Sequence, residues 1–278
     1  MPINNIITET IGGNNMKRST FIESLIRRIK RPKYGWKGDY KSWEQAKIDC
    51  SGYEAGNILE KVKAATLRVK NGTAAYERDS VLFNEIEYSW PLLSALMWIA
   101  ALNKSRLNVL DFGGSLGSTY FQNKKFLDDL GYAEWNIVEQ QNFVTTGRDC
   151  IGNATLQFFY TIDECIKKKG KPDILILACT LPYIERPYEL IRELLNYEIP
   201  HIIIDNTFFN YEERDRITVQ TVPPSIYSAS YPCWFLSYNK LKELVSDKYV
   251  IVSEHFNDSR IFLDGNPIQY RGFLAKLI

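Results

Sequence analysis

The segment LNVLDFGGSLG, residues 107–117, decides the fold of this chain. Its first half, residues 107–112, is an apolar run typical of a buried strand, and its second half is a glycine-rich turn. A helix is expected to begin at Ser118, directly after the turn. A strand, a tight turn and a helix in this order form the first unit of a doubly wound α/β fold, in which ligands bind beyond the carboxyl ends of the strands.

From this unit to the C-terminus, apolar runs alternate with helical segments. The run at residues 173–179 (DILILAC) is apolar almost throughout, as a strand inside a parallel sheet is. The last two runs, residues 249–256 and 270–277, have only a turn at residues 264–267 between them, so they are expected to pair antiparallel. The predicted fold class is α/β, with a Rossmann-like, mostly parallel sheet whose last strand is antiparallel. We expect the other strands at residues 135–139, 156–160 and 201–205, and helices at residues 118–130, 162–169, 187–197 and 239–246.

The glycine turn is the main candidate binding site. Gly113, Gly114 and Gly117 let the backbone turn tightly and approach a ligand, and the helix that follows offers unpaired N–H groups to an anion. The turn resembles the D-x-G-x-G-x-G pattern of S-adenosylmethionine (SAM) dependent methyltransferases, with Ser115 at the middle glycine. It does not fit G-x-G-x-x-G, and Asp111 stands where a dinucleotide-binding strand is usually apolar, which favours SAM over NAD. The alternative is a purely structural turn.

Three residues that follow later strands are further candidates for cofactor binding. Glu139 stands where an acid accepts hydrogen bonds from both ribose hydroxyls, or it is an exposed charge at the end of a strand. SAM and NAD folds share that acid, so Glu139 does not choose between them. Asp163 is placed either to touch the adenine or to cap the next helix. Cys179 begins a loop between cofactor and acceptor, and without an adjacent histidine it is expected to be a small core residue rather than a nucleophile.

Asp205 and His255 are the two candidate general bases for an acceptor hydroxyl. Asp205 ends the fifth strand, over the expected cleft, and His255 lies near the end of the penultimate strand. The alternative role for Asp205 is to order its loop. His201 begins its strand and is therefore expected at the opposite edge of the sheet.

An aromatic segment is the candidate for binding the acceptor. Residues 223–234 (PPSIYSASYPCW) are expected to form a proline-stiffened loop that carries Tyr227, Tyr231 and Trp234. Together with Tyr183 in the loop after residue 179, these rings suit a sugar face or an aromatic acceptor. The alternative is a loop pinned by its own aromatic side chains.

Composition excludes several classes of protein. The chain has 278 residues, and its 34 Lys and Arg against 33 Asp and Glu give no overall field for a nucleic-acid partner. Five cysteines without a C-x-x-C pair, and only two histidines, argue against a disulfide framework or a metal site and favour the reducing cytoplasm. Residues 90–102 are too short for a membrane span and are predicted to form a buried helix.

Several stretches together resemble a bacterial family of SAM-dependent methyltransferases, often encoded near surface-polysaccharide genes. They include YERDSVLFNEIEYSWPLL, LNVLDFGGSLGSTYFQN and DRITVQTVPPSIYSASYPCWF, and the resemblance runs from about Gly35 to the C-terminus. It implies the class I, Rossmann-like methyltransferase fold with SAM as cofactor, and it maps Asp111, Gly113, Gly117 and Glu139 onto the SAM site. It implies no particular acceptor and no catalytic residue.

The domain expectation is a flexible leader at residues 1–15, a helical cap extension at 16–75 and the methyltransferase domain at 76–278. A basic amphipathic helix at residues 17–33 either lies on the inner membrane as a peripheral contact or docks on its own domain. The leading hypothesis is methyl transfer to a hydroxyl of a glycan or a small glycan precursor, in polysaccharide biosynthesis. The alternatives are an NAD(P)-type oxidoreductase that shares the early sheet and a SAM-binding module without turnover.

Overall fold

The structure of the protein is a computed structural model that describes residues 34–50 and 55–278, apart from the side chains of residues 55–57 and of Asp258. Residues 34–278 belong to one unit, Tyr34–Ile278. The leader and the basic helix expected at residues 17–33 lie outside the described residues, so both stay predictions.

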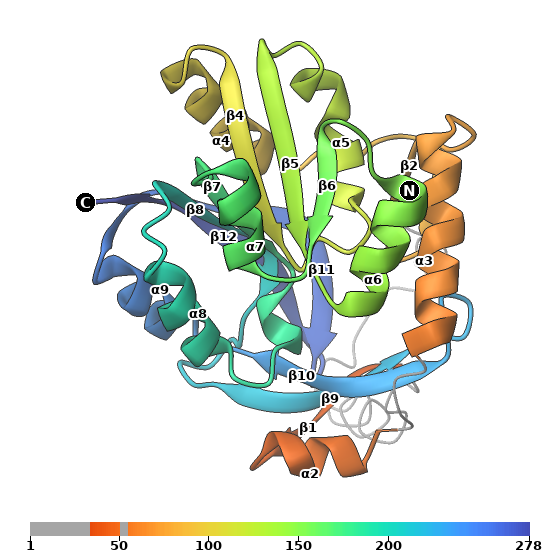
Figure 1. Ribbon diagram of the computed structural model, residues 1–278. Coiled ribbons are helices and arrows are strands. Elements are labelled where there is room, and N and C mark those ends of the chain that lie inside the picture. The colour runs from red at the N-terminus through yellow and green to blue at the C-terminus, as the bar shows by residue number, and fades with distance from the viewer. Residues whose placement is uncertain (1–33, 51–54) are drawn as a thin grey trace, which may run out of the picture. The chain divides into compact units, whose positions relative to one another are not determined.

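A seven-stranded sheet forms the centre of this unit (Figure 1), in the order β11-β12-β8-β7-β4-β5-β6. Its strands from β4 to β8 are parallel, and β12 runs antiparallel to both of its neighbours, β8 and β11. The predicted α/β class, with a mostly parallel sheet and an antiparallel last strand, is confirmed, and this is the class I methyltransferase arrangement. The strands are β4 (Arg106–Phe112), β5 (Tyr132–Val138), β6 (Leu156–Phe159), β7 (Ile174–Ala178), β8 (His201–Phe208), β11 (Tyr249–Leu263) and β12 (Asn266–Leu277).

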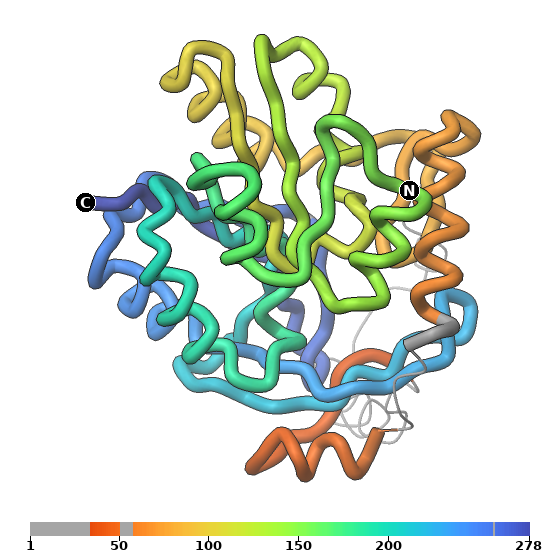
Figure 2. Tube along the Cα trace, viewed as in Figure 1, coloured from red at the N-terminus to blue at the C-terminus, as the bar shows by residue number. Residues whose placement is uncertain are grey.

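Helices cover both faces of the sheet, as the chain trace also shows (Figure 2). Successive side chains of β7 point to opposite faces: Ile174 and Ile176 join one apolar cluster, and Leu175 and Leu177 join the other. Both faces of β7 are therefore buried, which explains its continuous apolar run. The first face carries α3 (Ala55–Lys70), α4 (Trp90–Leu102), α5 (Ser118–Leu127) and α6 (Gln141–Thr146), and the second carries α7 (Ile162–Lys169), α8 (Pro187–Leu195) and α9 (Tyr238–Ser246).

A second, three-stranded antiparallel sheet was not predicted. It has the order β1-β9-β10 and contains β1 (Gly35–Tyr40), β9 (Arg216–Val222) and β10 (Ala229–Phe235). Residues 223–234 are thus not one loop, because their second half belongs to β10. Pro232 argues against a strand, yet it is tolerated here because β10 is an edge strand of this sheet.

The small sheet packs against one end of the main sheet. Phe235 of β10 shares an apolar cluster with Phe208 of β8 and Ile261 of β11, and its ring centroid lies 4.8 Å from that of Phe208. In Figure 1, β9 and β10 run as two long strands below the main sheet, with β1 and the short helix α2 (Trp43–Ile48) beside them.

The remaining strands, β2 (Tyr76–Arg78) and β3 (Val81–Phe83), form a hairpin. No helix within residues 34–50 and 55–278 is both long enough and apolar enough to cross a membrane. The helix expected at residues 90–102 is confirmed as α4, although Trp90 and Leu102 at its two ends are exposed.

Candidate cofactor and acceptor site

The turn between β4 and α5 lies where the strand order reverses, since β5 and β6 follow on one side of β4 and β7 and β8 on the other. Gly113 has φ of +74°, and a Cβ atom there would lie 2.5 Å from Cγ2 of Thr180. Gly117 is the N-cap of α5 with φ of +98°, and no side chain caps the helix. The turn therefore requires glycine at both positions and leaves the first N–H groups of α5 without a side-chain cap.

Asp111 supports the turn from behind. Its side chain is buried, and its Oδ2 accepts a hydrogen bond of 3.0 Å from Nε1 of Trp135. A Cβ atom on Gly114 would lie 2.5 Å from the same oxygen, so the carboxyl lies directly under the loop. Burial raises the pKa of Asp111 to about 7, against the Trp135 hydrogen bond, and the charge of Glu139 adds to the rise. We expected Asp111 to bind the cofactor, but the structure gives it a supporting position under Gly114.

Glu139 stands beside this turn. Phe112 and Val138 are partners in the parallel pairing of β4 and β5, and the N–H of Gly113 donates to the carbonyl of Val138 at 2.9 Å. Glu139 is the next residue; it is half-buried, and burial raises its pKa. The glycine turn and the acid expected to bind ribose therefore share one edge of the sheet.

Asp163 does not join this group. Its carboxylate is exposed and accepts a hydrogen bond of 3.0 Å from the hydroxyl of Tyr197. The prediction that Asp163 caps α7 is wrong, because Thr161 is the N-cap and accepts from the N–H of Glu164 at 3.1 Å. Thr161 and Glu164 have the spacing of a capping box, a signal that the sequence contained.

Cys179 lies at the end of β7, next to the turn. Its N–H donates to the carbonyl of Asp205 at 3.0 Å. Burial raises the pKa of its thiol to about 12, which disfavours the thiolate that a nucleophilic cysteine needs.

Asp205 and His255 form one pair. Nε2 of His255 lies 2.9 Å from Oδ1 of Asp205, although the two residues belong to β8 and β11 with β12 between them. Gly272 of β12 makes this possible, since it pairs with His255 and a Cβ atom there would lie 2.6 Å from Nε2. The other ring nitrogen, Nδ1, is buried and has no hydrogen-bond partner within the described part of the chain. The two residues predicted as rival bases are thus in contact.

Three of the four predicted acceptor-binding aromatics lie together. The rings of Tyr183 and Tyr231 are 5.5 Å apart, and the hydroxyls of Tyr227 and Tyr231 are 3.2 Å apart. Trp234 is the exception, because it stacks on Trp43 of α2 with centroids 6.0 Å apart. Alternation along β10 explains the difference, since Tyr231 and Trp234 are three residues apart and face opposite sides.

The β2–β3 hairpin contributes residues that we did not predict. Glu77 is 1% exposed, and the Ser118 hydroxyl, at the first turn of α5, donates to its carboxyl. Burial raises the pKa of Glu77 to about 7. Asp79 and Ser80 form the tip, with φ of +52° and +67°, as in a two-residue hairpin turn. The run Tyr76–Arg78 and its turn have the composition of an exposed segment, so the burial of Glu77 could not be predicted from it.

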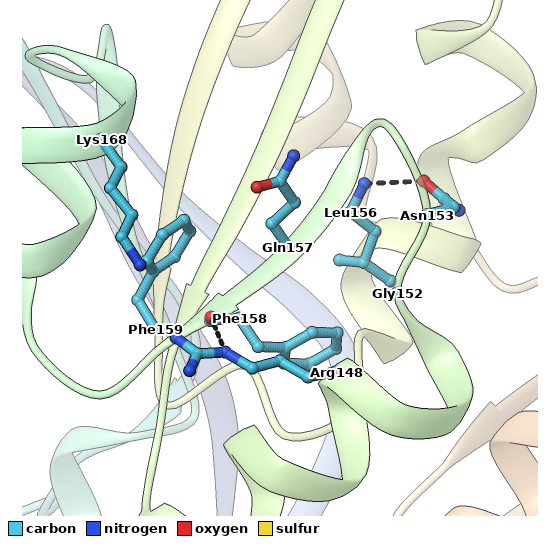
Figure 3. Close-up of a pocket in the computed structure, with 8 residues that line it drawn as sticks. All are labelled: Arg148, Gly152, Asn153, Leu156, Gln157, Phe158, Phe159 and Lys168. Carbon is cyan, nitrogen blue, oxygen red and sulfur yellow. Dashed lines mark hydrogen bonds between the residues drawn. The ribbon is translucent and has the colours of Figure 1, made fainter.

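A hollow of about 320 Å³ lies elsewhere, at the free edge of β6 (Figure 3). Arg148 Nε donates to the carbonyl of Phe158 at 2.9 Å, and Arg148 and Lys168 both pair with Glu164, at 3.0 and 2.8 Å. Arg148 thus occupies a carbonyl at the edge of β6, and the single charge of Glu164 is shared between the two cations, so we assign the hollow to edge protection. Its lining residues are Arg148, Gly152, Asn153, Leu156, Gln157, Phe158, Phe159 and Lys168.

No protein-family model matches the chain, and no curated protein matches it. Among solved structures, it is similar to the N-terminal domain of EvdMO1 with SAH and D-fucose, with 10% identity over 79% of this chain and 97% of the other and a TM-score of 0.47. It is also similar to magnesium protoporphyrin IX methyltransferase (ChlM) from Synechocystis PCC 6803 with SAM, with 12% identity over 82% and 99% and a TM-score of 0.44. A third similar structure is the glycopeptide N-methyltransferase MtfA with sinefungin. It has 13% identity over 67% of this chain and 94% of the other, with a TM-score of 0.44. These likenesses are weak, and the fold assignment rests on the strand order of the sheet.

Proposed function

We propose that the protein is a SAM-dependent methyltransferase whose acceptor is a hydroxyl of a glycan or a glycan precursor. The observation that carries the proposal is the β4–α5 turn at the reversal of strand order. It combines two positions where a side chain is excluded, Gly113 and Gly117, with an uncapped helix and with Glu139 on the next strand.

The residues around the turn fit SAM in chemical terms. The first N–H groups of α5 suit the methionine carboxylate, and Glu139 suits the two ribose hydroxyls as hydrogen-bond acceptor. When bound, SAM supplies a methyl group on a sulfonium, which passes to an aligned nucleophile and leaves neutral SAH. Asp111 keeps the turn in place under Gly114, so its role is support of the backbone.

A hydroxyl acceptor must also lose its proton. The Asp205–His255 pair is the candidate for this step, because Asp205 holds Nε2 of His255 and leaves Nδ1 without a partner among the described residues. In this proposal Nδ1 receives the proton as the acceptor oxygen bonds to the methyl carbon, and Asp205 stabilises the imidazolium that results. Asp205→Asn would then lower turnover and leave SAH binding unchanged.

Calorimetric titration with SAH and, separately, with NAD tests the cofactor. We expect SAH to bind and Glu139→Gln to weaken that binding at least about tenfold, since hydrogen bonds to a charged acceptor contribute about 1.5–3 kcal/mol. Glu193→Gln, an exposed acid on α8, is the matched control and should bind SAH like the parent protein. Binding of NAD without SAH would instead support the oxidoreductase alternative.

A second measurement separates an enzyme from a binding module. The protein is incubated with SAM labelled at the methyl group and with a cell extract that contains glycan precursors. Label that appears in the glycan fraction supports the enzyme, whereas SAH binding without any labelled acceptor supports the module. The cytoplasmic location, and the membrane contact through residues 17–33, stay part of the proposal; liposome flotation with and without residues 1–33 tests the contact, and equal binding by both forms rejects it.

A further inference from the structure

Two phenylalanine rings lie exposed on β11, an edge strand of the main sheet. Phe256 is 65% exposed and Phe262 is 61% exposed, although contact between a phenyl ring and water is unfavourable. In Figure 1, β11 descends from the main sheet towards the small sheet, and a turn joins it to β12. Single exposed apolar side chains are common on protein surfaces, so the arrangement of the two rings decides whether they form a binding surface.

The strand register places both rings on one face of the β11–β12 hairpin. Residues directly opposite in an antiparallel pair share a face, and so do residues two apart along a strand. The opposed pairs are Phe256 with Arg271, Arg260 with Gln269, and Phe262 with Pro267. Positions 267, 269 and 271 alternate along β12, so the three pairs lie in successive rows, about 7 Å apart, on the same face. These six residues form the hairpin patch, in which a row that contains Arg260 separates the two rings.

The opposite face of the hairpin is occupied. Ile261 and Ile268, which lie between the residues of the patch along their strands, are buried in the cluster around Phe208. The turn is also fixed, because Asp264 pairs with Arg216 of the small sheet. The hairpin patch is therefore the solvent face of a hairpin that is held in place from behind.

The two arginines of the hairpin patch keep their charge. Arg260 and Arg271 are exposed, and neither forms an ion pair within the part of the chain that the structure describes. The guanidinium carbon of Arg271 lies 3.7 Å from the ring centroid of Tyr238, a contact that orients the cation without cancelling its charge. In the row beyond Arg271, Glu254 faces a cation of its own, since Lys242 pairs with it at 2.8 Å.

Alternating rings and cations suit the surface of an anionic membrane. A phenyl ring enters the boundary between headgroups and acyl chains, and an arginine beside it binds lipid phosphate. A protein partner is less suited, because the core of a protein interface is contiguous, whereas these rings are about 14 Å apart along the strand. A second copy that adds a strand to β11 is opposed by the register shifts of β11, since bulges turn an edge strand away from pairing.

We propose that the hairpin patch docks the protein on a membrane that contains anionic phospholipid. Phe256 and Phe262 enter the headgroup boundary, and Arg260 and Arg271 bind phosphate groups. This contact is independent of the proposed methyl transfer, and it involves a different part of the chain from residues 17–33. A bilayer of neutral lipid would still receive the rings but would lose the ionic contacts.

The test measures sedimentation of the full chain with sucrose-loaded vesicles, made of phosphatidylcholine alone or of phosphatidylcholine mixed with phosphatidylglycerol. We expect at least about tenfold tighter binding to the mixed vesicles, and about fivefold weaker binding to them by Arg260→Gln. Phe256→Ser combined with Phe262→Ser should weaken binding at least about tenfold. The matched controls lie on helices of the first face: Leu102→Ser, 56% exposed on α4, and Lys125→Gln, exposed on α5, should bind like the parent protein.

Three vesicle results would overturn the inference: no binding of the parent protein to the mixed vesicles, equal binding to both kinds, or unchanged binding by the double phenylalanine variant. The last result would assign the contact to another segment, such as residues 17–33. Thermal unfolding shows whether each variant is folded, and if the double variant is not, Arg260→Gln decides. Analytical ultracentrifugation without vesicles supplies a fourth check, because a parent dimer that the double variant dissociates would make the patch a contact between copies and reject membrane docking.

Discussion

Replacing Asp111 with asparagine should stabilise the protein at alkaline pH. The carboxyl is 1% exposed, and burial raises its pKa from the ordinary value of 3.8 to about 7. That difference corresponds to about 4 kcal/mol of unfavourable charge burial once the group is ionised. Because the folded state binds this proton more tightly than the unfolded chain, the contribution of Asp111 is most favourable below about pH 4 and is lost as the pH rises to about 7.

Asparagine keeps the size of the side chain and an oxygen for the N–H of Trp135, but it carries no charge at any pH. Urea unfolding at pH 5 and pH 8 measures the effect. At pH 5 the unfolded chain has already lost most of this proton while the folded protein keeps it, so Asp111→Asn should be more stable by about 1.6 kcal/mol; at pH 8 it should be more stable by about 4 kcal/mol. Asp129→Asn, on the surface, is the control. An Asp111→Asn effect of the same size at both pH values would refute the argument from charge burial.

Three further outcomes follow from the same region and from the Asp205–His255 pair. Glu77→Gln should also stabilise the protein, because burial raises the pKa of Glu77 to about 7. The gain in the free energy of unfolding should grow from pH 5 to pH 8 and reach up to about 3 kcal/mol, which thermal unfolding at both pH values checks. Gly272→Ala should destabilise the protein by about 1–3 kcal/mol and move the NMR signals of the His255 ring, because its Cβ would lie 2.0 Å from the carbonyl oxygen of Ile204 and 2.6 Å from Nε2 of His255. Gly131→Ala, where the added Cβ meets ordinary contacts, should do neither. The affinity for SAM should rise more than the affinity for SAH as the pH increases towards 7, because only SAM brings a sulfonium charge to the carboxyls of Asp111, Glu77 and Glu139. Calorimetry with each ligand over this pH range measures both affinities, and an equal pH dependence for the two would contradict the prediction.

Most of the main sheet was predictable because its strands are buried on both faces. The strand expected at residues 173–179 became Ile174–Ala178, and the helix expected at residues 162–169 has those bounds. The small sheet was not predictable in the same way. Its strands β9 and β10 mix polar and apolar residues, and Pro232 gives β10 the composition of a loop. The strand β9 is completed by hydrogen bonds to β1, which lies about 180 residues earlier, and such a distant pairing leaves no local pattern in the sequence.

The site residues also divide into those that depend on local sequence and those that depend on distant pairings. The glycine turn and Glu139 were predictable, since both depend on the local order of strand, turn and helix. The Asp205–His255 contact was not, because it spans two strand pairings and relies on the missing side chain of Gly272, next to a register shift between Arg271 and Phe273. The burial of Glu77 was equally hidden, because it depends on a hairpin docking against the first turn of α5.

The carboxyl groups around the turn bear on how the protein would tell SAM from its product. Asp111, Glu77 and Glu139 all have a raised pKa because of burial, so without a nearby cation each gives up its proton reluctantly. A sulfonium in the turn would favour their ionised forms. Methyl transfer leaves neutral SAH, which removes that positive charge and with it the support for the ionised carboxyls. The turn would therefore bind SAM more tightly than SAH near neutral pH, in agreement with the pH dependence expected above.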